Sequence, residues 1–186
     1  MKRYLILFFV LTLCAGAGIT LAAPAPWITV FTVKGSVSYS DTGKDDWNPV
    51  YLSRIFLGGE SVRTGEASAA RIITEDGMEI IVREESRITN VSLSVSPLEN
   101  VYSFDLKSGG VSITVPENPE KRISCAVTAA QAVISSWGGS WTVNTGNSET
   151  GVTCRSGIVF VRAKGETVRL LQSDFVIIPD GEKPRK

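Results

Sequence analysis

The side chains that could carry chemistry in this sequence are carboxylates and tryptophans, because the chain contains no histidine. It therefore lacks the commonest general base, the usual zinc ligand and any Ser–His pair. Adjacent acidic pairs occur at Asp45–Asp46, Glu75–Asp76 and Glu84–Glu85. Successive side chains of a strand point to opposite faces, so these pairs fit solvated turns better than an acid–base site. We expect no enzyme, no catalytic residue, and no bound metal or cofactor.

Two tryptophans are the candidate interaction residues. Trp137 and Trp141 flank Gly138–Gly139, where a turn between strands would leave an indole partly exposed. An exposed indole can stack on a sugar or anchor a protein partner. Trp47, by contrast, is expected to plug the core. The glycine pair Gly109–Gly110 precedes no helix and no lysine-serine continuation, so we expect a turn between strands and not a phosphate loop.

The first residues predict export from the cytoplasm. Lys2 and Arg3 precede an apolar run from Leu5 to Leu13, and Thr20-Leu21-Ala22 fits a small-x-small cleavage site. Residues 1–22 are thus predicted to be a signal peptide, and the protein periplasmic or extracellular. The alternative is an uncleaved segment that anchors the protein in the inner membrane and gives its sole membrane contact. Cleavage leaves 17 basic and 19 acidic residues, a balance that indicates no nucleic-acid partner.

Two cysteines, Cys125 and Cys154, remain in the mature chain. An exported protein meets an oxidising compartment, where an even cysteine count favours a disulfide. We predict a bridge between neighbouring strands, which would stabilise the fold by roughly 3–4 kcal/mol in the chain-entropy model. The alternative is a pair of buried thiols that serve only as core packing.

The pattern after residue 27 predicts an all-β fold. Apolar and polar residues alternate in Ser36–Ser40 and Val91–Val95, and Val111–Val115 stops at Pro116, which cannot continue a ladder. Asp76-Gly77 lies between β-branched runs, so a tight hairpin with positive φ at the glycine is expected. We predict one β domain over 27–179 and a polar C-terminal tail over 180–186.

A weak repeat adds an expectation about architecture. Lys34–Val37, Ser108–Val111 and Ser156–Val159 share a polar-Gly-x-Val opening before an alternating strand. A recurring turn-then-strand unit suits an irregular, wrapped, solenoid-like sheet that is rich in antiparallel pairs. A β-sandwich is the competing architecture.

Several short motifs follow one another along the chain, and we expect their residues to have structural roles. These residues are Trp47, Gly59, Glu60, Thr64, Gly65, Asp76, Gly77, Gly138 and Gly157. Their order and spacing resemble the FecR-type domain, a bacterial extracytoplasmic module. The resemblance covers roughly 33–178, and two departures are Ala129 in place of a proline and Gly139 with Trp141 in place of Thr and Phe.

The resemblance implies a non-enzymatic module for protein interaction, sensing or regulation in the bacterial cell envelope. Well-known members of the family relay signals to a sigma factor through a cytoplasmic segment. Only Met1–Arg3 precede the apolar run here, so we expect a stand-alone domain whose partner is another envelope protein. The alternative function is a cell-envelope scaffold or glycan-binding protein that uses the sheet face or the Trp137–Trp141 turn.

Overall fold

The computed structural model describes residues 28–41, 44–51, 54–56, 58–118, 120–130 and 132–186. The expected signal peptide, its cleavage site and the start of the predicted domain at Trp27 lie outside these residues. The described residues form strands and contain no helix, so the all-β prediction is confirmed. Accordingly, no helix among them is long and apolar enough to cross a membrane.

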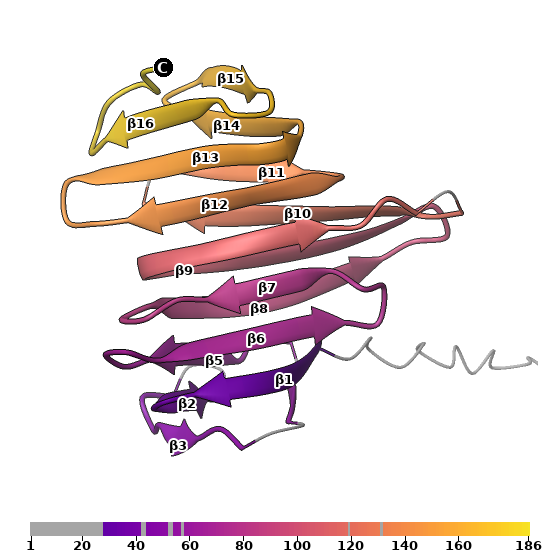
Figure 1. Ribbon diagram of the computed structural model, residues 1–186, viewed down its shortest axis with the longest axis vertical. Coiled ribbons are helices and arrows are strands. Elements are labelled where there is room, and N and C mark those ends of the chain that lie inside the picture. Colours follow the sequence, from indigo (N-terminus) through magenta and orange to yellow (C-terminus); the bar gives the residue numbers. More distant parts are fainter. Residues whose placement is uncertain (1–27, 42–43, 52–53, 57, 119, 131) are drawn as a thin grey trace, which may run out of the picture.

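The strands stack along one long axis in two layers (Figure 1). Figure 1 places β1 near one end of the stack and β16 near the other, with β9 between them. The front layer contains, in spatial order, β4 (Ile55–Phe56), β1 (Ile28–Lys34), β6 (Ala69–Thr74), β7 (Glu79–Val82), the second half of β9 (Glu99–Val115), β12 (Gly139–Thr145), β13 (Glu149–Gly157) and β16 (Phe175–Pro179). The back layer contains β3 (Asn48–Pro49), β2 (Val37–Ser40), β5 (Ser61–Thr64), β8 (Arg87–Val95), the first half of β9, β10 (Arg122–Ala129), β11 (Ala132–Ser136), β14 (Val159–Ala163) and β15 (Glu166–Leu170).

The sheet is antiparallel except at one pair, β9 with β10. The 17-residue β9 begins in the back layer and ends in the front layer, so the chain must return before β10 can start. Residues 116–118 and 120–121 lie in that return segment, after which Arg122 is opposite Glu99, at the start of β9. The architecture thus combines features of both expected alternatives, since two layers face each other and successive hairpins climb along one axis.

The core lies between the layers and follows from the alternation of apolar residues. In β10 the inward positions are buried and the outward ones are partly or fully exposed. Side chains from both layers meet in one continuous apolar cluster that extends from Val37 to Ile178. Trp141, Ile113 and Tyr102 are among its largest fully buried members. One core therefore holds both ends of the stack together.

The repeated polar-Gly-x-Val segments mark corners where the chain crosses between layers. Gly35, Gly109 and Gly157 all have positive φ, at 74°, 78° and 79°. A Cβ on Gly109 would lie 2.3 Å from Oγ and 2.6 Å from Cα of Ser86, so only glycine fits this corner. Gly109 thus bends β9 from within. The expected turn between separate strands is not found at this position.

Serine hydroxyls complete these corners. At each of three crossings the hydroxyl oxygen of a serine accepts a hydrogen bond from a backbone N–H of the chain that crosses beside it, which satisfies a donor that the sheet ladder leaves free. The pairs are Ser36 N with Ser68 Oγ at 2.9 Å, Gly110 N with Ser86 Oγ at 2.8 Å, and Ser140 N with Ser156 Oγ at 3.0 Å.

The predicted disulfide is absent, and the expectation of neighbouring strands is wrong. Cys125 on β10 and Cys154 on β13 are free, fully buried thiols. The chain crosses from the back to the front layer after β11, so the two cysteines end in different layers, and neither strand pairs with the other. Burial raises the pKa of both thiols. The alternative expectation, cysteines as core packing, describes what is observed.

The C-terminal residues do more than form a polar tail. Arg185 pairs with Ile177 in an isolated antiparallel bridge beside β16, with backbone hydrogen bonds of 2.8 and 2.9 Å. Lys186 Nζ lies 2.6 Å from the Asp174 carboxylate, and Lys183 Nζ lies 3.4 Å from Glu166. The chain end therefore folds back over the last strands of both layers.

Candidate binding groove beside Trp137

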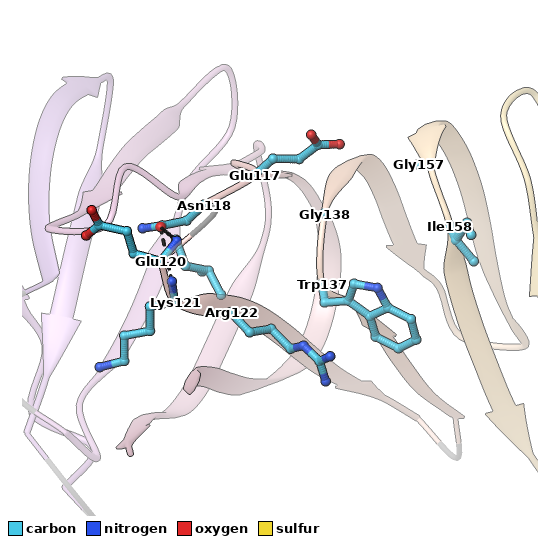
Figure 2. Close-up of a pocket in the computed structure, with 10 residues that line it drawn as sticks. Glu117, Asn118, Glu120, Lys121, Arg122, Trp137, Gly138, Gly157 and Ile158 are labelled. Carbon is cyan, nitrogen blue, oxygen red and sulfur yellow. Dashed lines mark hydrogen bonds between the residues drawn. The ribbon is translucent and has the colours of Figure 1, made fainter. Parts of the chain in front are cut away.

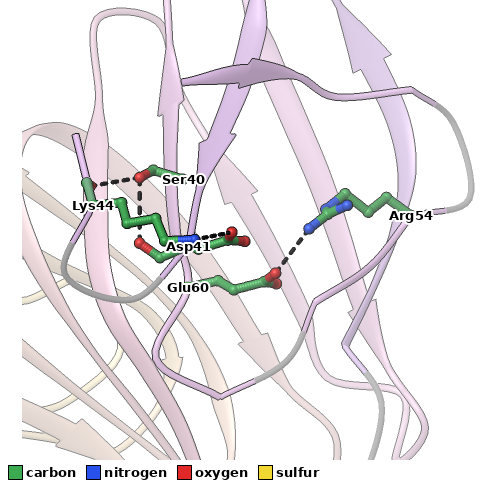
Figure 3. A network of polar contacts seen from close by, with 5 residues as sticks. All are labelled: Ser40, Asp41, Lys44, Arg54 and Glu60. Atoms are coloured by element: carbon green, nitrogen blue, oxygen red, sulfur yellow. Dashed lines mark hydrogen bonds and ion pairs between the residues drawn. The ribbon is translucent and has the colours of Figure 1, made fainter. Parts of the chain in front are cut away.

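The Gly-Glu motif residue Glu60 forms a buried ion pair. Its carboxylate accepts a hydrogen bond from Arg54 Nη2 at 2.8 Å, and the Glu60 side chain is almost fully buried (Figure 3). The same guanidinium lies 3.2 Å from the ring centroid of Tyr39. Beside this pair, the Ser40 hydroxyl donates to the Lys44 carbonyl at 2.6 Å. A carboxylate already held by an arginine in this way is a fold contact and not a free acid or base.

The Thr-Gly motif connects three neighbouring chain crossings. Thr64 Oγ1 accepts a hydrogen bond from Ser86 N at 3.0 Å and donates to the Arg83 carbonyl. Gly65 N donates to the Ser36 carbonyl at 2.9 Å. These bonds satisfy backbone groups that leave the ladder where the chain changes layer. Thr64 and Gly65 are adjacent in the motif because each bonds to a different crossing beside the end of β5.

The Asp-Gly motif forms the expected hairpin and also fastens it. Gly77 has a φ of 79° and lies in the turn between β6 and β7, as predicted. Asp76 Oδ2 accepts hydrogen bonds from Asn100 Nδ2 and Tyr102 Oη, both at 2.7 Å. Burial, together with the hydrogen bond to Asp76, raises the pKa of the Tyr102 phenol. The aspartate therefore ties a front-layer turn to β9.

Trp47 does not plug the core, contrary to expectation. It precedes the short strand β3, whose residues are exposed, and its ring is only partly buried. The guanidinium carbons of Arg63 and Arg87 lie 4.3 and 5.1 Å from the ring centroid, and the indole Nε1 donates to Asp45 at 2.8 Å. Arg63 and Arg87 are opposite each other on β5 and β8. Trp47 thus covers a pair of like charges on the outer surface.

The two candidate interaction tryptophans have opposite environments. Trp141 is fully buried on β12, and its Nε1 has no hydrogen-bond partner among the described residues. It is therefore a core residue, and its expected role in binding is wrong. Trp137 follows β11 at a corner, and 51% of its surface is exposed. The sequence places both residues near one turn, but Trp137 lies at the corner where the chain leaves the back layer, whereas Trp141 lies on β12 of the front layer with its ring in the core.

Trp137 is held in place by two contacts. Its ring stacks on Phe160 of β14 with centroids 4.9 Å apart and an interplanar angle of 26°. The guanidinium carbon of Arg122 lies 5.8 Å from the Trp137 ring centroid, and Figure 2 shows the two side chains pointing toward each other. Stacking of this kind fixes the indole before any ligand arrives and lowers the entropy cost of binding.

The exposed indole lines a groove of about 480 Å³. One wall is the return segment before β10, and the other is formed by the corners at Gly138 and Gly157 (Figure 2). The Ser136 hydroxyl fixes the first corner by donating to the Gly138 carbonyl at 2.6 Å. The groove residues are Glu117, Asn118, Glu120, Lys121, Arg122, Ile123, Trp137, Gly138, Gly157 and Ile158.

Charged groups of the groove are free to meet a ligand. Asn118 Oδ1 accepts hydrogen bonds from Glu120 N at 2.9 Å and Lys121 N at 3.2 Å, and so shapes the return segment. Within the described residues, the side chains of Glu117, Glu120 and Lys121 form no hydrogen bond or ion pair. An ordered aromatic ring beside unpaired charges offers apolar contact and hydrogen bonds, which suits recognition more than catalysis.

Sequence reasoning identified Trp137 and missed its partners. Phe160 lies in an apolar run, Val159–Val161, which reads as fully buried, yet its ring faces outward beside Trp137. Arg122 gave no signal, because it contacts Trp137 only through the pairing of β10 with β11. Alternation along β14 puts Phe160 on the side opposite to Val159 and Val161, so burial of these two valines places the Phe160 ring outward.

Comparisons with known proteins place this geometry in a family. A family model described as FecR protein matches residues 60–160, which is more than half of the 186-residue chain. Two crystal structures of a candidate anti-sigma factor from Parabacteroides distasonis, at 2.50 and 1.65 Å resolution, align with a TM-score of 0.56 each and identities of 17% and 16%. Each alignment covers 67% of this chain and 57% of that protein, so this chain spans less than two thirds of its neighbour's length. None of the curated proteins matches the chain.

Proposed function

The chain belongs to the FecR protein family, and from this premise we propose that it is an exported, non-enzymatic module that senses or regulates by binding another protein of the bacterial envelope. Its structural neighbour is described as a candidate anti-sigma factor, and a regulator of that kind would act through protein contact. The motif residues Glu60, Thr64 and Asp76 are used up in fold contacts. The family signature therefore supports the scaffold, and the partner contact lies elsewhere.

The observation that carries the proposal is the half-exposed, pre-ordered Trp137 in the groove. Tryptophan and arginine are the residues most enriched among binding hot spots, and Arg122 lies beside the ring. Leaving so large an apolar ring in water disfavours the free state, and a partner that covers it recovers that cost. We therefore assign the groove as the centre of the protein contact.

A photocrosslinking residue at position 158, where Ile158 lines the groove, tests this assignment in the envelope of the producing cell and leaves Trp137 in place. We expect a discrete protein adduct from this position. The matched control is Phe175, which is 49% exposed and lies in the front layer on β16. Equal adducts from both positions would place the contact elsewhere, and the absence of any protein adduct would contradict the proposed function.

The glycan-binding alternative has one feature in its favour and one against it. A single exposed indole could stack on a sugar ring. The platform of two neighbouring tryptophans does not form, however, because Trp141 is fully buried. Retention of the mature protein on purified cell wall, lost in Trp137→Ala, would favour the glycan alternative over a protein partner.

A further inference from the structure

The groove opens beside a surface that carries several arginines. We call the outward residues around Trp137 on β10, β11, β14 and β15 the arginine–tryptophan face. It is made of Arg122, Val133, Trp137, Phe160, Arg162 and Arg169.

Strand register places these side chains next to one another. Phe160 on β14 is directly opposite Arg169 on β15, so the residue whose ring stacks on Trp137 has an arginine as its neighbour on the next strand. Arg162 is directly opposite Val133, which is 42% exposed. Side chains directly opposite each other across a strand pair have Cβ atoms about 4.5–5.5 Å apart. The face is therefore one contiguous surface with apolar residues between arginines.

Arg122, Arg162 and Arg169 form no ion pair within the described residues. One carboxylate lies next to this group, because Glu99 of β9 is opposite Arg122 in the strand register. The outward positions described on these four strands carry no carboxylate. Glu166, at the start of β15, alternates with Thr167 and Arg169, so it lies on the other side of the strand, where it pairs with Lys183. This local excess of positive charge occurs in a chain with 19 basic and 19 acidic residues. Three arginines without an ion-pair partner thus gather on this face.

We propose that the arginine–tryptophan face docks an acidic segment of a partner protein, with an apolar side chain of that segment in the groove against Trp137. This inference rests on the proposed function and names the chemistry of the partner. Guanidinium groups bind carboxylates through two parallel hydrogen bonds, and arginine beside tryptophan is the usual composition of a hot spot. Glu117 and Glu120 on the groove wall repel carboxylates there and direct them to Arg162 and Arg169.

Two other binding partners, an anionic membrane and a neutral glycan, fit this face less well. An anionic membrane attracts proteins with a polybasic segment, whereas the mature chain carries slightly more acid than base. A neutral glycan would use Trp137 but would have no use for three unpaired arginines. An acidic protein segment uses both features of the face.

Selection from a random peptide library displayed on phage, with the mature chain as bait, tests the proposal. We expect selected peptides to combine Asp or Glu with a bulky apolar residue, and synthetic versions to bind more weakly as salt rises. Arg162→Glu with Arg169→Glu should weaken their binding about tenfold or more, as should Trp137→Ala. The matched control is Lys34→Glu with Arg155→Glu, which makes the same charge change at exposed positions of the front layer and should leave affinity unchanged.

Three results would overturn the proposal. These are selected peptides that lack acidic residues, equal binding by the two double variants, and arginine-dependent binding of phosphatidylglycerol vesicles in place of peptides. Equal thermal midpoints of both double variants exclude unfolding as the cause of lost binding. A protein adduct at position 158 that survives Arg162→Glu with Arg169→Glu would refute the acidic partner alone, whereas absence of any adduct would refute the proposed function itself.

Discussion

At the scale of single residues, inward or outward direction decides what each tryptophan does. Trp137 and Trp141 are four positions apart and chemically identical, yet one is half exposed and the other fully buried. The indole N–H of Trp141 has no hydrogen-bond acceptor among the described residues. The packing of Trp141 thus outweighs the cost of an unpaired donor.

The two tryptophans should therefore separate stability from binding. Trp141→Ala removes a fully buried indole and should lower the free energy of unfolding by about 3–5 kcal/mol. Trp137→Ala removes an exposed ring and one stack on Phe160, so its cost should be about 0.5–1.5 kcal/mol. Chemical denaturation of the two variants measures both values. A larger loss from Trp137→Ala would mean that this ring is a core residue and not a contact for a partner.

The cysteines give a second residue-level prediction. Burial raises the pKa of the Cys125 and Cys154 thiols, and both side chains are inaccessible. We expect the native mature protein to resist a thiol reagent at neutral pH, because the reactive thiolate is scarce and shielded. Denaturation without reductant should then release two reactive thiols per mature chain. A count of zero after denaturation would restore the disulfide that the structure lacks.

At the scale of elements, the glycine corners determine where each strand changes layer. The sequence revealed them as a weak repeat, because positive φ and a missing Cβ leave a glycine signature. It could not reveal that Ser68, Ser86 and Ser156 complete the corners, since each of these serines is far from its partner in the sequence. Local turn chemistry was therefore predictable, and contacts between separate crossings were not.

Gly109 offers a test of the corner geometry with an internal control. Gly109→Ala combines a left-handed φ of 78° with a Cβ that would overlap Ser86, whereas Gly165→Ala has a φ of 76° and open space around the Cβ. Strain alone should lower the free energy of unfolding by about 1 kcal/mol at Gly165. The added overlap should raise the loss at Gly109 to about 3 kcal/mol or more. Equal thermal midpoints for the two variants would show that the corner is looser than the structure indicates.

The clamp at the end of β15 gives a prediction about pH. Asp174 accepts a hydrogen bond from the Leu171 backbone N–H and pairs with Lys186, and these contacts lower the pKa of its carboxyl. A lowered pKa means that the clamp contributes stability above the unfolded-state value of about 3.9 and loses it as pH falls through the folded value. An NMR titration of the Asp174 carboxyl should give a midpoint below that of a model peptide. Asp174→Asn should remove this part of the pH dependence, and a midpoint above the model value would reverse the sign and refute the clamp.

At the scale of the whole molecule, the fold class was readable from strand alternation, whereas the layer of each strand was not. Cys125 and Cys154 illustrate the limit: the residue pattern predicts two strands and a turn between them, which would bring their ends side by side. The layer crossing after β11 separates them instead. The layer in which a strand lies depends on whether the chain makes a corner or an ordinary turn before it. A corner is distinguished by its contacts with residues that are far away in the sequence. The groove beside Trp137 was hidden for the same reason, because one wall belongs to the β9–β10 connection and the other to the corners at Gly138 and Gly157.

The long stack also predicts how stability is distributed. β9 has a partner on both sides in each layer, namely β8 and β10 at the back and β7 and β12 in front. β15 is bonded to β14 alone among the described strands, so its amides open without breaking the core. Hydrogen exchange followed by mass spectrometry should therefore show the slowest amides in β9 and fast ones in β15.

Two substitutions sharpen that prediction. Ile113→Ala in β9 leaves a cavity in the shared core and should speed exchange in both halves of the stack. Val168→Ala in β15 touches the core only at its end, so faster exchange should stay within β14 and β15. This difference follows because each strand contacts only its neighbours along the stack, while β9 alone belongs to both layers. Uniform acceleration by both variants would mean that the stack opens as one unit, and that β9 has no special place in holding the two layers together.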